Sequence, residues 1–170
     1  MGKSTLAQRY AEDHHGVLNL DIDIVVSLIG GWRDDFFAVL PAARRIASAM
    51  ADAHLRDGRD VVLPQLVTNL DEVARFETTT KLAGAEYVEI ALTVGLTEQV
   101  RRFRLKSNRS EVNAEVDRVV TAHGGRDFLE RVRGHFDAYM AQRPQSLGLV
   151  TTGADAGESY ARLLAVLDDV

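Results

Sequence analysis

The sequence predicts an α/β fold in which a parallel sheet carries helices on both faces, because strand and helix signals alternate along the chain. Short apolar runs rich in β-branched residues, typical of buried parallel strands, alternate with longer stretches whose apolar residues recur at helical spacing. Right-handed crossovers between successive strands would give a doubly wound sandwich. No repeat or linker interrupts the alternation, so residues 1–170 are expected to form one domain.

The first half of the chain alternates regularly between the two kinds of element. Helices are predicted where apolar residues lie three and four apart, and glycines after such stretches mark their ends. Strands are predicted at short β-branched runs. In chain order the expected elements are a helix ending near Asp13, a strand at 17–21, a helix at 22–29, a helix from Phe36 to about Asp57 and a strand at 60–64.

The second half continues the pattern. Asn69 or Thr68 can cap the next helix, whose first turn holds Asp71 and Glu72, because a helix N-terminus favours negative charge. Gly84 is expected to end that helix. After this helix the sequence predicts a strand at 86–93, helices at 97–106, 111–122 and 126–142, a strand at 147–151 and a helix at 157–167.

Composition narrows the functional class. The 20 basic and 25 acidic residues give a net charge of −5, which disfavours nucleic-acid binding over a broad face. The 46% of hydrophobic residues is enough for the core of a soluble globular domain. The absence of cysteine excludes disulfides, cysteine-based zinc sites and thiol nucleophiles. No apolar run approaches the roughly 18 residues of a membrane span and no signal peptide is evident, so we expect a cytoplasmic protein.

The chain opens with Gly2-Lys3-Ser4-Thr5, which matches the second half of the phosphate-binding loop pattern G-x-x-x-x-G-K-[ST]. The glycine lets the backbone approach a phosphate closely, and the following helix offers N–H groups and a positive dipole end. Lysine supplies a cation for the outer phosphates, and the serine hydroxyl can ligate Mg²⁺. The alternative is an ordinary helix capped by Ser4 or Thr5.

The first glycine of this pattern and the strand that feeds the loop would lie before Met1. In a parallel sheet of this type that strand is central and buried on both faces. We therefore expect Met1 to be an internal loop residue preceded by roughly ten further residues, which form a strand and half a loop. The mass of the natively expressed protein tests this expectation.

Two carboxylates follow the first visible strand. Asp21 and Asp23 lie at its carboxyl end, where open parallel sheets place their ligand crevice. In an extended segment, residues two apart project to the same face, so both can reach one substrate pocket. Either can accept a proton from a substrate hydroxyl or help to hold Mg²⁺, and Asp23 is the first choice for the base. The alternative is that one of them caps the helix at 22–29.

Five cations and no acid lie between residues 101 and 109. Arginine suits phosphate oxygens, and a mobile arginine segment can close over a transferring phosphoryl group and exclude water. The sequence thus indicates a helical lid at about 101–125, with Arg104 and Arg109 as the best individual candidates. A solvated basic helix face is the alternative.

Three further residues are candidate binding groups because of where they stand in the pattern. Gln65 follows the second visible strand at the crevice edge and can bind substrate. Trp32, after paired glycines, can line an acceptor pocket. Thr152, after the last strand, can pass its backbone along an adenine ring. Each also has a plain explanation, as a loop, core or turn residue.

Taken together, four segments resemble the small P-loop kinases often labelled AAA-type ATP-binding kinases, relatives of gluconate kinase, shikimate kinase and chloramphenicol phosphotransferase. The resemblance implies a three-layer P-loop NTPase fold of the nucleoside and nucleotide kinase type, with a short helical lid. It also implies ATP-dependent transfer of the γ-phosphoryl group to a hydroxyl of a small molecule. The matching segments are Gly2–Thr5, 18–23, 58–65 and 101–104.

The same resemblance assigns roles to individual residues. Lys3 would contact the β- and γ-phosphates, Ser4 would ligate Mg²⁺, and Asp23 would orient or deprotonate the acceptor, while Arg104 would stabilise charge from the lid. Many P-loop proteins have Asp where Gln65 stands, so Asp21 or Asp23 would replace that carboxylate.

The implied partners are ATP, Mg²⁺ and a small-molecule acceptor, with no membrane or nucleic acid, and the protein is expected to be a monomer or homodimer. Three alternatives remain open. One is a nucleotide-binding regulatory module without transfer activity. Another is a nucleoside, nucleotide or polynucleotide-end kinase. The last is a plain α/β interaction domain.

Overall fold

The computed structural model describes residues 2–106, 111–151 and 156–169, with the backbone alone for 96 and 103–106. Arg109 and Thr152 therefore lie outside the described residues. In chain order the elements are α1 (Lys3–Asp13), β1 (Leu18–Asn19), α2 (Ile22–Ser27), α3 (Phe36–Arg56), β2 (Val61–Val62), α4 (Leu70–Leu82), β3 (Ile90–Thr93), α5 (Leu96–Lys106), α6 (Glu111–Ala122), α7 (Arg126–Met140), β4 (Leu147–Val150) and α8 (Ala156–Asp168).

The helices lie where the sequence predicts them, with ends that differ by a few residues. The range expected for α6 is confirmed, whereas α2 ends at Ser27 and α7 at Met140. Asn69 caps α4 as predicted, since its side chain accepts hydrogen bonds from the amides of Asp71 and Glu72. None of these described helices is sufficiently long and apolar to cross a membrane.

The strands pair in parallel, as the alternation predicts, but the ladders are short. Leu18 and Asn19 of β1 pair with Val61 and Val62 of β2, and β3 pairs with β4 over four residues each. Among the described residues these are two separate two-stranded sheets, β1–β2 and β3–β4. β1 and β2 are shorter than the predicted 17–21 and 60–64, because only two residues of each strand pair with the other.

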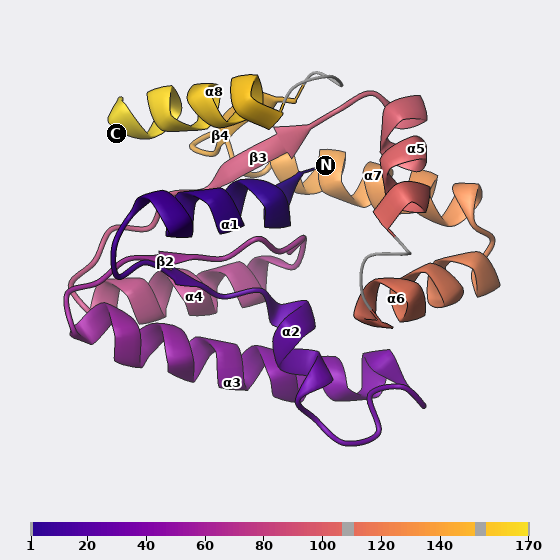
Figure 1. Ribbon diagram of the computed structural model, residues 1–170, viewed down its shortest axis with the longest axis horizontal. Coiled ribbons are helices and arrows are strands. Elements are labelled where there is room, and N and C mark those ends of the chain that lie inside the picture. The colour runs from indigo at the N-terminus through magenta and orange to yellow at the C-terminus, as the bar shows by residue number, and fades with distance from the viewer. Residues whose placement is uncertain (1, 107–110, 152–155, 170) are drawn as a thin grey trace.

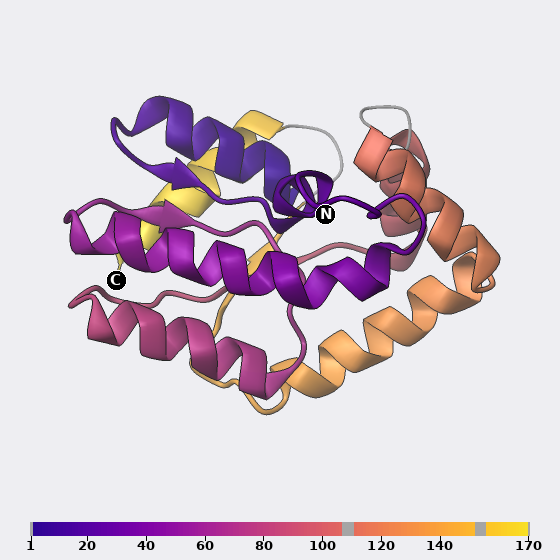
Figure 2. The ribbon, with the colours of Figure 1, turned by 90° about the horizontal axis from the view of Figure 1, so that it is seen from below.

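The helices surround the strands, and the carboxyl ends of the strands lie at one end of the molecule (Figure 1). Helix α1 contacts α8, and α3 contacts α2 and α4. Helices α5, α6 and α7 lie together at the end where β1 leads into α2 and β3 leads into α5, and Figure 2 shows the same grouping from below. The amino terminus lies toward this end, so α1 begins near the edge of the strands where parallel folds bind ligands.

The core consists of two apolar clusters, one on each ladder. The first packs α2 and α3 beside β1 and β2, with Ile22 and Val26 fully buried at its centre. The second joins α1 and α8 to β3 and β4 through Leu6, Leu149 and Leu163. Each ladder therefore has its own supporting helices, and the site described next lies between them.

Candidate functional site

The amino-terminal motif begins helix α1. Gly2 is the N-cap, and its carbonyl accepts the first intrahelical hydrogen bond from the Leu6 amide at 2.9 Å. Ser4 is therefore the second residue of the helix and not its cap, which leaves its hydroxyl available for a partner outside the helix. The first-turn N–H groups and the dipole of α1 face the carboxyl edge of the strands, as an anion-binding helix terminus requires.

The hydroxyl of Ser4 reaches across to the end of β1. Ser4 Oγ donates a hydrogen bond to Asp21 Oδ2 at 3.0 Å. The other carboxylate oxygen of Asp21 accepts from the Asp23 amide at 3.1 Å and so caps α2. Asp21 is thus held at both oxygens, next to the hydroxyl of Ser4. A hydroxyl and a carboxylate so close together are hard oxygen donors of the kind that Mg²⁺ takes from proteins, and this pair fits that ion.

Asp23 does not lie beside Asp21 on an extended segment, and that part of the sequence reasoning is wrong. Helix α2 begins at Ile22, because the Asp21 cap turns the chain directly after β1. Asp23 is partly buried in the first turn of α2. The alternative interpretation, in which Asp21 caps this helix, is confirmed.

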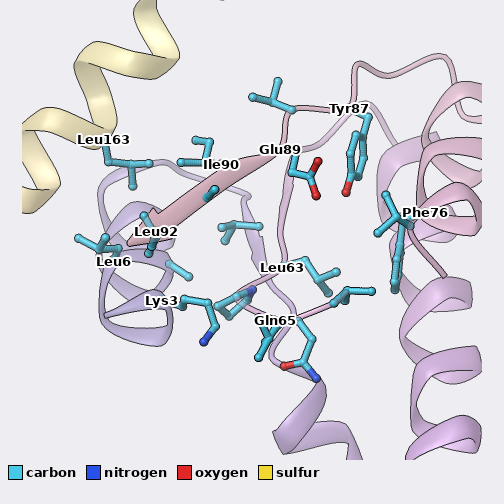
Figure 3. Close-up of a pocket in the computed structure, with 18 of the residues that line it drawn as sticks. Lys3, Leu6, Leu63, Gln65, Phe76, Tyr87, Glu89, Ile90, Leu92 and Leu163 are labelled. Carbon is cyan, nitrogen blue, oxygen red and sulfur yellow. The ribbon is translucent and has the colours of Figure 1, made fainter. Parts of the chain in front are cut away.

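Lys3 and Gln65 meet at one end of a large cavity. The cavity has a volume of about 600 Å³ and lies between the two ladders, with both residues in its lining. Figure 3 shows Lys3 and Gln65 at the same end of it, with Glu89 and Tyr87 toward the other end. Gln65 stands as predicted at the crevice edge after β2, and Lys3 begins α1 at that edge.

Arg133 of α7 is a cation that the sequence analysis missed. Its guanidinium Nη1 donates to the Val94 carbonyl at 2.8 Å, directly after β3, and the residue also lines the cavity. A weaker contact of 3.3 Å joins its Nε to Asp137 one turn later. Only the fold brings α7 to the end of β3, since in sequence Arg133 is one charge of an ordinary amphipathic helix.

The first cations of the 101–109 run are paired with Glu98 one turn earlier. Arg101 and Arg102 donate their Nε groups to its carboxylate at 2.6 and 2.7 Å. The hydrogen bond from Arg101, followed by that from Arg102, lowers the pKa of Glu98 to about 2. Arg102 also reaches Thr151 Oγ1 at 3.3 Å, which ties α5 to the end of β4.

The best lid candidates are less fully described. Arg104 belongs to helix α5, but its side chain is not among the described ones. Arg109, and also the nucleotide candidate Thr152, lie entirely outside the described residues. The lid at about 101–125 stays a prediction.

Trp32 is placed mainly in the core. Its side chain is only 5% exposed and belongs to the cluster formed by α2 and α3. The Arg33 guanidinium lies 4.5 Å from the centre of its ring, and Arg33 in turn pairs with Glu111 at the start of α6. The loop that carries Trp32 is thereby linked to the predicted lid helices, while its role in an acceptor pocket stays a prediction.

Comparison with known proteins identifies the family. A family model described as an AAA domain matches residues 1–129, which include the motif Gly2–Thr5 and the ends of β1 and β2. The chain belongs to the AAA domain family. This family has the P-loop NTPase fold and binds nucleotides, so the broad resemblance is confirmed, while the role of Gly2–Thr5 as a phosphate loop stays a prediction. Searches of curated proteins and of solved structures found no match.

Proposed function

We propose that this protein is an ATP-dependent phosphotransferase that moves the γ-phosphoryl group to a hydroxyl of a small molecule. The observation that supports the proposal most is the 3.0 Å hydrogen bond between Ser4 and Asp21. It joins the hydroxyl of the phosphate loop to a strand-end carboxylate at the beginning of a helix. In the proposal, the phosphates of a nucleotide would lie beside this hydroxyl and carboxylate, at the positive end of the helix dipole.

The residues of the loop would hold the triphosphate. The Lys3 ammonium would lie against the outer phosphate oxygens, and the first-turn amides of Gly2, Lys3, Ser4 and Thr5 would donate hydrogen bonds to the others. Ser4 and Asp21 would hold Mg²⁺, which when bound would neutralise charge on the β- and γ-phosphates. Arg109 and Thr152 are further candidates for contact with the nucleotide.

The acceptor would lie beside α2. Its hydroxyl oxygen forms a new bond to the γ-phosphorus while the bond from that phosphorus to the bridging oxygen breaks and ADP leaves. Asp23 would orient the hydroxyl and take its proton. Gln65 and Trp32 are candidates for binding the rest of the acceptor, and Arg104 for stabilising charge on the transferring group. Nucleosides, nucleotides and polynucleotide ends are alternative acceptors of the same chemistry.

Two observations favour a second function, a regulatory module that binds nucleotide without transferring phosphate. The strand β2 is followed by Pro64 and Gln65, so its end supplies an amide where many P-loop proteins supply a carboxylate. In addition, both oxygens of Asp21 are already engaged by Ser4 and by the α2 cap. Binding of ATP would then have no chemical consequence.

Replacing Lys3 tests the proposed function. Lys3→Ala should lower phosphoryl transfer by about a hundredfold or more, because transfer relies on fixed charges that stabilise the developing charge. The measurement is ADP release in the presence of Mg²⁺ and a panel of sugars, nucleosides and hydroxylated antibiotics. It is made on this chain and on a chain extended at its amino terminus with a complete loop. Lys81→Ala, an exposed lysine in the last turn of α4, is the matched control.

The outcomes separate the two functions. Loss of turnover in Lys3→Ala with full turnover in Lys81→Ala supports the phosphotransferase. A rise in melting temperature with ATP and Mg²⁺, but no product with any acceptor, favours the regulatory module. Equal turnover in both variants contradicts both, since the phosphate loop would then have no part in catalysis.

A further inference from the structure

Helix α6 is attached to the connection between α2 and α3, residues 28–35, which we call the Trp32 segment. Glu111, the first residue of α6, pairs with Arg33 of this segment. Just after the other end of α6, the ring of His123 lies edge to face with that of Phe37 in α3, with ring centres 6.3 Å apart. Figure 1 shows α6 next to α2 and to the beginning of α3. Two partly buried valines of α6 pack against the apolar cluster of α2 and α3: Val112 and Val116.

The described side chains of α5 are attached to another part of the molecule. Arg101 and Arg102 pair with Glu98 inside α5, and Arg102 also reaches Thr151 at the end of β4. The range predicted as a lid therefore contains two helices with different attachments. Helix α5 is tied to the strand ends, whereas α6 is tied to the segment that follows α2.

The Trp32 segment borders a second cavity, with a volume of about 420 Å³. Its lining includes a hydroxyl, a guanidinium and a carboxylate side chain, together with paired glycines whose backbone no side chain covers. Such mixed groups suit a hydroxylated molecule, because each hydroxyl both donates and accepts hydrogen bonds. The residues concerned are Ser27, Gly30, Gly31, Arg33 and Asp34.

This second cavity lies next to the residue proposed as the base. Ser27, which lines it, is the last residue of α2, and Asp23 stands one turn earlier. Residues four apart lie on the same face of a helix, about 6 Å along its axis. A molecule bound beside Ser27 can therefore direct a hydroxyl toward Asp23.

The charges at this second cavity disfavour an anion. Among its lining residues, all of which the structure describes, only Arg33 is basic, and Glu111 already pairs with it. Asp34 adds a negative charge. A carboxylate or phosphate on a ligand would have to displace Glu111, whereas an uncharged hydroxyl leaves the pair in place. With side chains 63% and 76% exposed, the pair contributes little to stability, so we look for its effect in ligand selection.

We propose that α6 covers an acceptor site at the second cavity, and that Glu111, by pairing with Arg33, makes this site select uncharged hydroxyl compounds over anions. The proposal rests on the proposed function for the role of the bound molecule as phosphoryl acceptor. It gives Glu111 a part in specificity and leaves the nucleotide to the other side of the site, where Lys3 and Ser4 lie.

Two sugars that differ at one carbon test the selection. D-Glucose carries a CH₂OH group where D-glucuronate carries a carboxylate. Titration calorimetry gives the affinity, and fluorescence of Trp32 locates the binding, because this single tryptophan of the sequence lines the second cavity. The parent chain should bind D-glucose at least about fivefold more tightly than D-glucuronate, since the anion meets like charge.

Replacing Glu111 should change this preference. In Glu111→Gln the Arg33 guanidinium can pair with a carboxylate, so D-glucuronate should bind about fivefold more tightly than to the parent chain, while affinity for D-glucose stays within about twofold. A second substitution, Arg33→Gln, should remove the gain. The matched control is Glu130→Gln in α7, which breaks an exposed pair with Arg126 of the same helix and should alter neither affinity.

Amide hydrogen exchange tests whether α6 covers the site. Saturation with D-glucose should slow exchange at residues 115–120 of α6 by about threefold or more, because the bound molecule holds the helix in place. Exchange at residues 100–102 of α5 should not change. Equal slowing in both helices would mean that they act as one lid, which overturns the assignment of α6 to the acceptor.

The remaining outcomes also decide. Equal affinity of the parent chain for the two sugars overturns the selection, and so does an equal gain for D-glucuronate in Glu130→Gln, because only the net charge would then matter. Absence of binding by both sugars at millimolar concentration, or binding without a change in Trp32 fluorescence, overturns the acceptor site at the second cavity.

The site and the enzyme can fail separately. Binding of D-glucose at Trp32 without phosphoryl transfer would retain a site for hydroxyl compounds and contradict the phosphotransferase. Transfer by the parent chain to D-glucuronate as readily as to D-glucose would retain the enzyme and contradict the role of Glu111.

Discussion

Asp21 uses its two carboxylate oxygens for two purposes, one structural and one proposed to be catalytic. One oxygen caps α2 and the other accepts from Ser4. Asparagine is as good an N-cap as aspartate, so Asp21→Asn should change the free energy of unfolding by less than about 1 kcal/mol. The same substitution removes the charge that we propose to hold Mg²⁺, so affinity for ATP with Mg²⁺ should fall by about tenfold or more. Urea unfolding and nucleotide titration with and without Mg²⁺ measure the two effects separately.

Two companion variants sharpen this prediction. Asp21→Ala removes the cap as well as the charge, so its free energy of unfolding should be about 1 kcal/mol lower than that of Asp21→Asn. Asp23→Asn leaves the Ser4 contact in place and should leave the Mg²⁺ dependence of binding unchanged. If Asp21→Asn binds ATP with Mg²⁺ as tightly as the parent chain, the proposed metal site is wrong.

The difference between Asp21 and Asp23 shows what residue patterns reveal and what they omit. Their position after a strand predicts both at the crevice, and the motif at Gly2–Thr5 predicts a phosphate loop. Which carboxylate reaches Ser4 depends on the direction in which the chain turns after β1, and that turn depends on the cap. The contact joins residues 17 positions apart, beyond the reach of local spacing rules. Arg133 was missed for the same reason.

At the scale of elements, helix α4 offers a direct test of how a cap sets a boundary. Asn69 is exposed, and its side chain accepts from Asp71 N at 2.9 Å and Glu72 N at 3.2 Å. Asn69→Ala should lower the free energy of unfolding by about 1 kcal/mol, because two first-turn amides lose their partner. Asn69→Asp should be close to neutral. Equal stability of all three chains in urea would show that solvent replaces the cap.

Helix boundaries were predictable because caps and glycines are local signals, but the strands were less so. The segment 86–93 was expected to be a strand throughout, yet β3 begins at Ile90. A strand exists only where a neighbouring strand pairs with it, and β4 begins opposite Ile90. The division into two ladders likewise depends on which strand edges pair with one another, and the sequence of a single strand does not contain this information.

At the scale of the whole molecule, a cluster of polar side chains connects several segments at the end of the cavity opposite Gly2–Thr5. Glu89, just before β3, accepts hydrogen bonds from Tyr139 in the last turn of α7, and from Arg143 and Ser146 between α7 and β4. Arg143 also donates to Glu77 of α4 at 2.6 Å, and its side chain is only 11% exposed. The cluster therefore joins segments 50 to 66 residues apart. It holds the β3–β4 ladder against α4 and α7 at the far end of the cavity.

This cluster makes stability depend on pH in a defined direction. Burial raises the pKa of the Glu89 carboxyl, but the hydrogen bonds from Ser146, Tyr139 and Arg143 outweigh it and hold the pKa below its ordinary 4.5. Because the folded value is the lower one, the contribution of Glu89 is complete above about pH 5, and it is lost as pH falls through 4.5 and below. In this range the unfolded chain takes up the proton before the folded chain does.

Glu89→Gln should consequently be less stable than the parent chain by about 1–3 kcal/mol at pH 7, the cost of weakened hydrogen bonds to a charged group. The difference should shrink as the pH is lowered from about 5 toward 3, because the parent chain loses the contribution that the variant lacks. Urea unfolding at several pH values measures it, with Glu86→Gln at an exposed site of the same segment as the control. A difference that stays constant with pH would mean that Glu89 acts through packing and not through its charge.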